Sequence, residues 1–222
     1  MHKLWEHFQD GGWGMYLILF WSIITIGIII ERAVFLFGTA SVNKETFLAT
    51  LQKCILAGDI AKAVKVCSAQ NAPLARIVQS GLVKVNRPDE EVQAAMDEAA
   101  LRELPKIGAR TGFLALLSNL AMLSGLLGTV SGLITAFGAV SAKSVDPSQK
   151  ATILAQGISE AMNCTAFGLG VAIIGLIGFA ILNGKTQGIE DDVNEASVQV
   201  LNLVVSNREK VNLQALGQQP GA

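Results

Sequence analysis

The sequence has few charged residues, and this shortage excludes several classes of protein. Only 16% of its 222 residues are charged, whereas 51% are hydrophobic, and the mean hydropathy is +0.46. Such a chain is too apolar for an ordinary soluble fold and too apolar to be disordered. The 17 Lys+Arg and 18 Asp+Glu leave a net charge of -1. This charge balance therefore does not predict a protein that binds nucleic acid.

Cysteine and histidine are also scarce. The three cysteines are scattered without a CxxC pair, so neither a disulfide framework nor a zinc site of thiolates is predicted. The two histidines, His2 and His7, lie together near the N-terminus and could bind a metal. No further ligand type clusters with them, so we predict no metal centre and no cofactor.

Long apolar blocks are what the sequence does contain. The first block is uncharged and ends at Glu31, the second is uncharged, and the third contains one charge, Glu160. The first covers ~24 Å as a helix and needs the preceding glycines to span a bilayer core of ~30 Å. Blocks of this length predict transmembrane helices rather than the central helices of a soluble all-α protein. They run from Met15 to Ile30, from Phe113 to Val140 and from Ile153 to Leu182.

The first block is interpreted as an uncleaved span, because no small-x-small cleavage site follows it. Residues 31 to 112 carry eleven of the seventeen Lys+Arg. Arg32, Lys106 and Arg110 lie near span ends, where basic residues favour the cytoplasmic side. We therefore predict an all-α membrane protein of three transmembrane helices, with the N-terminus outside and the C-terminus inside.

The predicted organisation follows the chain from one side of the membrane to the other. Its parts are a periplasmic N-terminus (1–13), transmembrane helix 1 with its cytoplasmic extension (14–37), a helical cytoplasmic domain (38–112), transmembrane helix 2 (113–140), a periplasmic loop (141–152), transmembrane helix 3 (153–182) and a cytoplasmic C-terminal helix and tail (183–222).

Helix boundaries in the cytoplasmic part can be predicted from single residues. Gly58 ends one helix, Asp59 caps the next, and Pro73 opens a third. A helix from about Glu90 is expected to run directly into the second span. A separate amphipathic helix is expected from Glu190 to Val211.

The second and third spans are rich in small residues. Gly128 and Gly132 have the GxxxG spacing that lets two helices approach closely. This pattern indicates packing within one chain, or packing that also lines an oligomeric interface or pore. Glu160 has no lysine or arginine within the spans as a counter-ion. It either reaches back to the outer headgroups or takes up and releases protons in an ion path.

Two sequence motifs carry a family resemblance. Residues 125–132 (GLLGTVSG), followed by Ala136-Phe137, resemble the second-span signature of the MotA/TolQ/ExbB proton channel family. Residues 157–162 (GISEAM) and 165–169 (TAFGL) resemble its third-span signature. The number of predicted spans, three, and the chain length resemble those of the ExbB/TolQ branch of this family.

The resemblance implies a homo-oligomeric ring, typically a pentamer, in the bacterial inner membrane. The ring would surround an ExbD/TolR-like single-span protein with a membrane Asp and would act on a TonB-like or TolA-like effector. It would use the proton-motive force to energise transport across the outer membrane, or its maintenance. By position, Thr129, Thr165 and Glu160 would form the ion path, and Gly125, Gly128, Gly132 and Gly168 would serve helix packing.

The sequence departs from the family pattern at Met122 and Ile174, where prolines are usual. We therefore do not predict the kinks that such prolines would give to the second and third spans. Gliding motility driven by the same type of motor, or a scaffold without ion conduction, are the alternative functions. An intramembrane enzyme is not predicted, because the spans hold one acid and no histidine.

Overall fold

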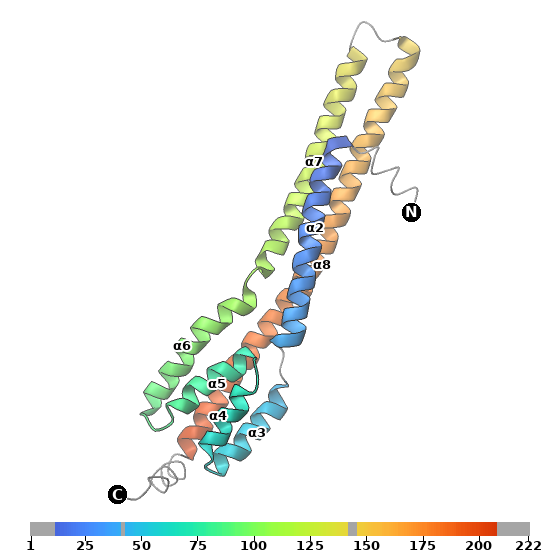
Figure 1. Cartoon of the computed structure of the whole chain (residues 1–222). Helices are drawn as coiled ribbons and strands as arrows, with labels where there is room; N and C mark the ends of the chain where they lie inside the picture. Colours follow the sequence, from blue (N-terminus) through green and yellow to red (C-terminus); the bar gives the residue numbers. More distant parts are fainter. Residues whose placement is uncertain (1–11, 41–42, 142–145, 208–222) are drawn as a thin grey trace, which may run out of the picture. The chain divides into compact units, whose positions relative to one another are not determined.

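The computed structural model describes residues 12–40, 43–141 and 146–207, and these residues form helices without strands (Figure 1). The predicted all-α class is confirmed for this part of the chain. The elements are α2 (Gly12–Val34), the π-helical turn η1 (Phe35–Thr39), α3 (Lys44–Leu56), α4 (Ile60–Ser68), α5 (Pro73–Val83), α6 (Asp89–Gly108), α7 (Thr111–Ser141) and α8 (Pro147–Ser206).

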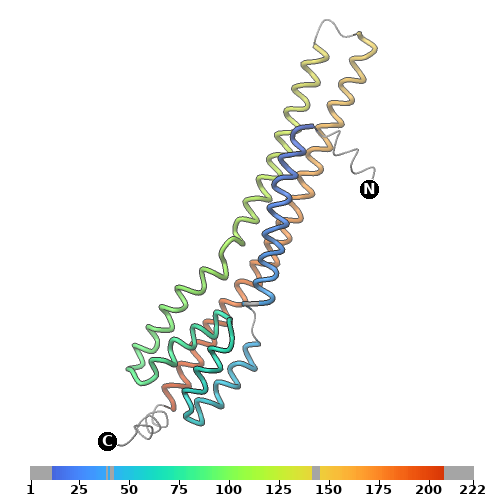
Figure 2. The backbone as a smooth tube through the Cα atoms, viewed as in Figure 1, coloured from blue at the N-terminus to red at the C-terminus, as the bar shows by residue number. Residues whose placement is uncertain are grey.

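The chain divides into two compact units. We call the first the membrane unit; it comprises Met1–Arg32 and Arg110–Leu182. The second, called the helical unit, comprises Ala33–Ala109 and Asn183–Ala222. The backbone trace in Figure 2 follows α2, α7 and the first part of α8 side by side within the membrane unit. The helix α8 thus contributes residues to both units.

Within the part of the chain that the structure describes, three helices are long and apolar enough to cross a membrane. Their apolar windows, in α2, α7 and α8, have mean hydropathies of 2.1, 1.8 and 2.3, and less than a third of each window is buried. Large apolar side chains such as Ile134 and Met162 are accordingly exposed. An apolar outer surface suits lipid or a neighbouring chain. The prediction of three spans is confirmed.

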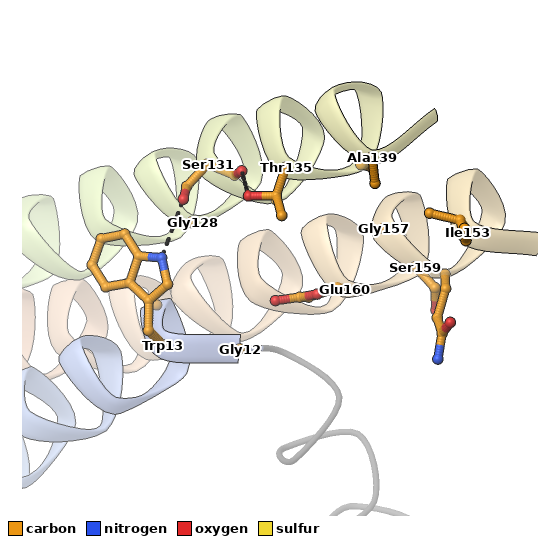
Figure 3. Close-up of a pocket in the computed structure, with 14 residues that line it drawn as sticks. Gly12, Trp13, Gly128, Ser131, Thr135, Ala139, Ile153, Gly157, Ser159 and Glu160 are labelled. Carbon is orange, nitrogen blue, oxygen red and sulfur yellow. Dashed lines mark hydrogen bonds between the residues drawn. The ribbon is translucent and has the colours of Figure 1, made fainter. Parts of the chain in front are cut away.

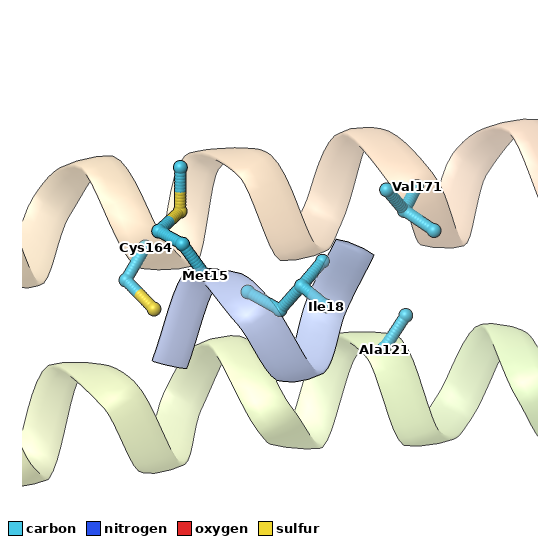
Figure 4. Packing of buried hydrophobic residues seen from close by; sticks show 5 residues of the cluster. All are labelled: Met15, Ile18, Ala121, Cys164 and Val171. Atoms are coloured by element: carbon cyan, nitrogen blue, oxygen red, sulfur yellow. The ribbon is translucent and has the colours of Figure 1, made fainter. Parts of the chain in front are cut away.

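The core of the membrane unit is a small cluster in which α2 lies between α7 and α8. Met15 and Ile18 of α2 contact Ala121 of α7 and Cys164 and Val171 of α8 (Figure 4). The residues from α7 and α8 are small or medium in size, so the helix axes can approach while α2 supplies the larger side chains.

The helix expected to run from about Glu90 into the second span is interrupted, so that prediction was wrong. Between α6 and α7, Arg110 has φ 65°, in the left-handed region. A residue with a Cβ loses ~1–2 kcal/mol there. The Arg110 guanidinium donates to the Glu31 carboxylate at 2.5 Å, and this ion pair helps to offset that cost.

The C-terminal amphipathic helix is not a separate element. The helix α8 continues from the third apolar block through to Ser206 without a break. Gly184 and Gly188 lie inside this helix with open space beside them. A glycine lowers helix stability by ~1 kcal/mol but does not end a helix held by its neighbours. The predicted end at Val211 lies outside the described residues.

Three boundaries in the helical unit, the end of α3 and the starts of α4 and α5, lie where the sequence predicts. The carboxylate of Asp59 accepts from the amide of Lys62 at 2.9 Å and so caps α4. Gly58 has φ 76°, which glycine adopts without strain. Pro73 is the first residue of α5.

Candidate ion-path site in the membrane unit

The helices α7 and α8 approach most closely where glycine faces glycine. A Cβ on Gly168 would lie 2.9 Å from the carbonyl oxygen of Ala121 and 3.0 Å from Cα of Gly125. A Cβ on Gly125 would lie 3.2 Å from the carbonyl oxygen of Cys164. These neighbours are backbone atoms, which cannot rotate away. Only glycine at both positions allows this separation.

One turn along from this approach, two threonine hydroxyls meet between the helices. The hydroxyl of Thr129 on α7 forms a short hydrogen bond with the hydroxyl of Thr165 on α8. The Thr129 hydroxyl, which has one proton to donate, also lies 3.0 Å from the carbonyl of Gly125 and 3.3 Å from that of Ala161. Thr165 lies 3.3 Å from the same Gly125 carbonyl. The closely packed glycines thus bring two hydroxyls and two carbonyl oxygens together.

A second close contact joins all three helices. A Cβ on Gly14 of α2 would lie 2.8 Å from Sγ of Cys164 and 3.1 Å from Cα of Gly128. A Cβ on Gly128 would overlap the same sulfur, whereas one on Gly132 would make ordinary contact with Ala161 at 3.5 Å. Gly128 therefore packs against both other helices, and the nearest neighbour of Gly132 is Ala161 on α8.

Glu160 lies on α8 at the wall of a cavity of about 600 Å³. Figure 3 shows its side chain beside Gly12, the first residue of α2, with Ser131 and Thr135 of α7 nearby. The residue is half-buried, and among the described residues it has no hydrogen bond or ion pair. The next residue, Ala161, offers its carbonyl to Thr129. Glu160 is therefore a chain neighbour of the threonine site, although its carboxylate faces the cavity.

This arrangement can carry out cation chemistry. Hydroxyls both donate and accept, and carbonyls accept, so the Thr129–Thr165 pair can contact a proton carrier or a dehydrated cation. A carboxylate that has no ion-pair partner among the described residues adds a group that can bind a cation or a proton. Among the described residues, no cluster of three His, Cys, Asp or Glu is arranged for a metal ion. His2 and His7 lie outside those residues.

Sequence reasoning did not identify two hydrogen bonds between α2 and α7. The indole of Trp13 donates to Ser131 at 3.1 Å, and that of Trp21 donates to Ser124 at 3.2 Å. The two tryptophans are eight residues apart in α2 and the two serines seven residues apart in α7, so each pair is separated by about two helical turns. Side chains about two turns apart lie on the same face of a helix. The sequence therefore contains a signal that one face of α2 pairs with one face of α7.

The helices α7 and α8 are regular at the two positions where the resemblance led us to expect proline. Met122 and Ile174 both lie in uninterrupted helix and are 41% and 56% exposed. Both lie near the Gly125–Gly168 approach in sequence, yet their side chains point outward. The close approach thus forms between helices that have no proline kink at these two positions.

The sequence is similar to those of known membrane proteins. A family model described as the MotA/TolQ/ExbB proton channel family matches residues 69–195, which include both threonines and Glu160. The putative biopolymer transport protein ExbB-like 1 of Synechocystis sp. is 31% identical over 185 residues, covering 81% of this chain and 70% of that protein.

Two further relatives come from other lineages. The putative biopolymer transport protein ExbB homolog of Methanothermobacter thermautotrophicus is 26% identical over 190 residues, which are 86% of this chain and 65% of that protein. The Tol-Pal system protein TolQ of Haemophilus influenzae is 36% identical over 100 residues, which are 44% of this chain and 42% of that protein.

Proposed function

This chain belongs to the MotA/TolQ/ExbB proton channel family, and we propose that it is the ring-forming subunit of an ion-driven motor in the bacterial inner membrane. It is a multi-pass membrane protein of the ExbB/TolQ type. In the proposed motor it uses the proton-motive force to energise transport across the outer membrane, or the maintenance of that membrane.

The observation that carries this proposal is the hydroxyl pair between α7 and α8. Thr129 and Thr165 meet beside the carbonyls of Gly125 and Ala161, within helices whose outer surfaces are apolar. Polar groups at this depth are costly unless they serve a site or pair with one another. We propose that the pair lines the ion path and that Glu160 is its membrane carboxylate.

The proposed assembly contains five copies of the chain around an ExbD/TolR-like partner. The partner crosses the membrane once and carries an Asp, which the ions neutralise as they pass Thr129 and Thr165. Each charge that crosses a potential of 100 mV releases ~2.3 kcal/mol. Several ions therefore supply enough energy for a mechanical step that reaches a TonB-like or TolA-like effector.

In the proposed orientation the N-terminus is outside the cytoplasm and the helical unit is inside it. Arg110 and its ion-pair partner Glu31 lie at the end of the membrane unit where α7 begins and the apolar block of α2 ends. Basic residues at span ends favour the cytoplasmic side, which supports this orientation.

The stoichiometry of the purified assembly tests the proposal. The chain, extracted in mild detergent with the product of a neighbouring single-span gene, is expected to have the mass of five copies bound to that partner, measured by native mass spectrometry. A monomeric chain that never retains a single-span partner would contradict the proposed ring. A stable oligomer that keeps its role after Thr129→Val and Glu160→Gln would instead indicate a scaffold.

A further inference from the structure

The cavity beside Glu160 has a polar lining that the ring proposal does not use. Its volume is about 600 Å³, and the described residues that line it come from α2, α7 and α8 of one chain. Its polar side chains are Ser131, Thr135, Gln156, Ser159 and Glu160. Polar groups in a membrane-spanning unit face protein or water, because lipid cannot satisfy them. A cavity of this size and polarity is roomy enough for several waters.

Glu160 reaches this cavity because of the residue at the start of α2. Gly12 has φ 64°, and a Cβ there would overlap Oε1 of Glu160. Any larger residue would therefore have to displace the carboxylate. The same helix end presents backbone N–H groups without helical partners, which attract an anionic side chain. Gly12 thus leaves free the space that the carboxylate of Glu160 occupies.

The cavity is closed on one side by the junction of the three helices. Gly14 and Gly128, which both line it, contact each other and Cys164 with no room for even a Cβ. Glu160 and this closely packed junction therefore line the same recess.

We propose that this recess is a hydrated vestibule through which a monovalent cation, hydronium or Na⁺, reaches Glu160 from inside a single subunit, with Gly12 as the positioning residue. A hydronium ion gives its proton to Oε1 or Oε2, so that one O–H bond breaks, one forms and a water is left. Na⁺ instead loses part of its hydration to the carboxylate and nearby hydroxyls. Passage onward to the threonine pair rests on the proposed function, whereas hydration of the recess does not.

The hydration is tested by the reactivity of single introduced cysteines. Thr135 and Ser159 line the recess, while Ile134 and Ile158, their sequence neighbours, do not. In the complete assembly in lipid nanodiscs, a charged methanethiosulfonate should modify Thr135→Cys and Ser159→Cys at least about tenfold faster than Ile134→Cys and Ile158→Cys, because only a hydrated thiol ionises readily. The unaltered chain, whose three cysteines are buried, gives the background.

Equal rates at all four positions would overturn the vestibule whether or not the chain drives a motor. If the motor proposal is wrong, the modification rates are still expected to differ between recess and control positions. Failure of the vestibule and failure of the motor proposal are therefore distinguishable. The labelling experiment still tests the vestibule if Gly12→Ala fails to fold, because the cysteine variants retain Gly12.

The positioning role is tested by Gly12→Ala with Gly27→Ala as its control. Gly27 lies in the same helix with nothing within 4 Å of its Cβ position. In proteoliposomes that hold the assembly, Gly12→Ala should lower ion uptake and move the pH at which uptake is half-maximal, and Gly27→Ala should change neither. A lower rate with an unmoved pH profile would show a merely structural role. Uptake that depends on pH alone identifies hydronium, uptake that needs Na⁺ identifies Na⁺, and uptake indifferent to both overturns the proposal.

Discussion

Thr129 on α7 and Thr165 on α8 share a hydrogen bond and both reach the carbonyl of Gly125. The contact joins hydroxyls that are 36 residues apart in the sequence. It depends on the glycine approach one turn away, because larger residues there would hold the two helices apart. The polar site and the packing motif are therefore parts of one structure.

The first prediction concerns these hydroxyls. The double variant Thr129→Val and Thr165→Val keeps the shape of both side chains and removes both hydroxyls. We expect the chain to remain in the membrane at normal amounts, while the process that the motor energises is lost. The measurement is a growth or motility assay alongside quantitative immunoblotting of membranes.

Thr25→Val is the matched control for that variant. The Thr25 hydroxyl is buried in the membrane unit but donates only within its own helix, to the carbonyl of Trp21 at 2.8 Å. Its loss should leave the process intact. An unimpaired double variant, or an equal loss in Thr25→Val, would remove the threonine pair from the ion path.

The second prediction tests the close approach of α7 and α8. In Gly168→Ala the new methyl meets two backbone atoms at about 3 Å, so the helices must separate. Overpacking of this kind costs ~1–3 kcal/mol, and we expect a lower melting temperature in detergent. Gly170→Ala, with nothing within 4 Å, should melt at the same temperature or slightly higher. Equal melting of the two variants would contradict the packing role.

Local features of the structure could be predicted from the sequence, whereas features that depend on distant residues could not. The three spans, the cap of α4, the start of α5 at Pro73 and the family motifs were readable, because each depends on local composition or on residues a few positions apart. The break at Arg110 was not readable. It depends on a left-handed residue and on an ion pair to Glu31, which is 79 residues away in the chain.

The site was readable only in part, for the same reason. The sequence places Thr129, Thr165 and Glu160 on two spans, but their relative positions depend on the rotation of each helix about its axis. The structure brings the two threonines together and turns Glu160 toward α2. The roles of Gly12 and Cys164 follow from contacts among three helices, and no local pattern marks such contacts.

The third prediction concerns an ion pair within the helical unit. Lys44 of α3 contacts Asp192 at 2.8 Å and Glu195 at 2.7 Å, both on α8, and the hydrogen bonds to these carboxylates raise the pKa of Lys44. A raised lysine pKa means that the stabilisation is present below ~pH 10.4 and is lost as the pH rises through the folded-state value.

Lys44→Met should therefore speed hydrogen exchange of the α3 amides at neutral pH, and the difference should shrink in high salt. The control is Arg102→Met, which breaks an ion pair with Glu98 inside one helix, α6. That change should not affect α3. Unaltered α3 exchange in Lys44→Met would show that the pair does not attach α3 to α8.

The fourth prediction concerns a buried thiol. Burial raises the pKa of Cys67 from 9.0 to about 11. The thiolate is the reactive form, so the thiol should react with a soluble disulfide reagent about tenfold faster per pH unit up to about pH 11. The rate is measured by absorbance in a chain carrying Cys54→Ala and Cys164→Ala. A rate that levels off near pH 9 would contradict the raised pKa.

The central claim is that ions cross the membrane along the threonine pair and Glu160. The direct measurement is proton uptake by proteoliposomes containing the complete assembly under an imposed membrane potential. The account predicts uptake by the unaltered assembly and its loss in Glu160→Gln and in the Thr129→Val, Thr165→Val chain, with every assembly still intact. Equal uptake by the unaltered and altered assemblies would contradict it.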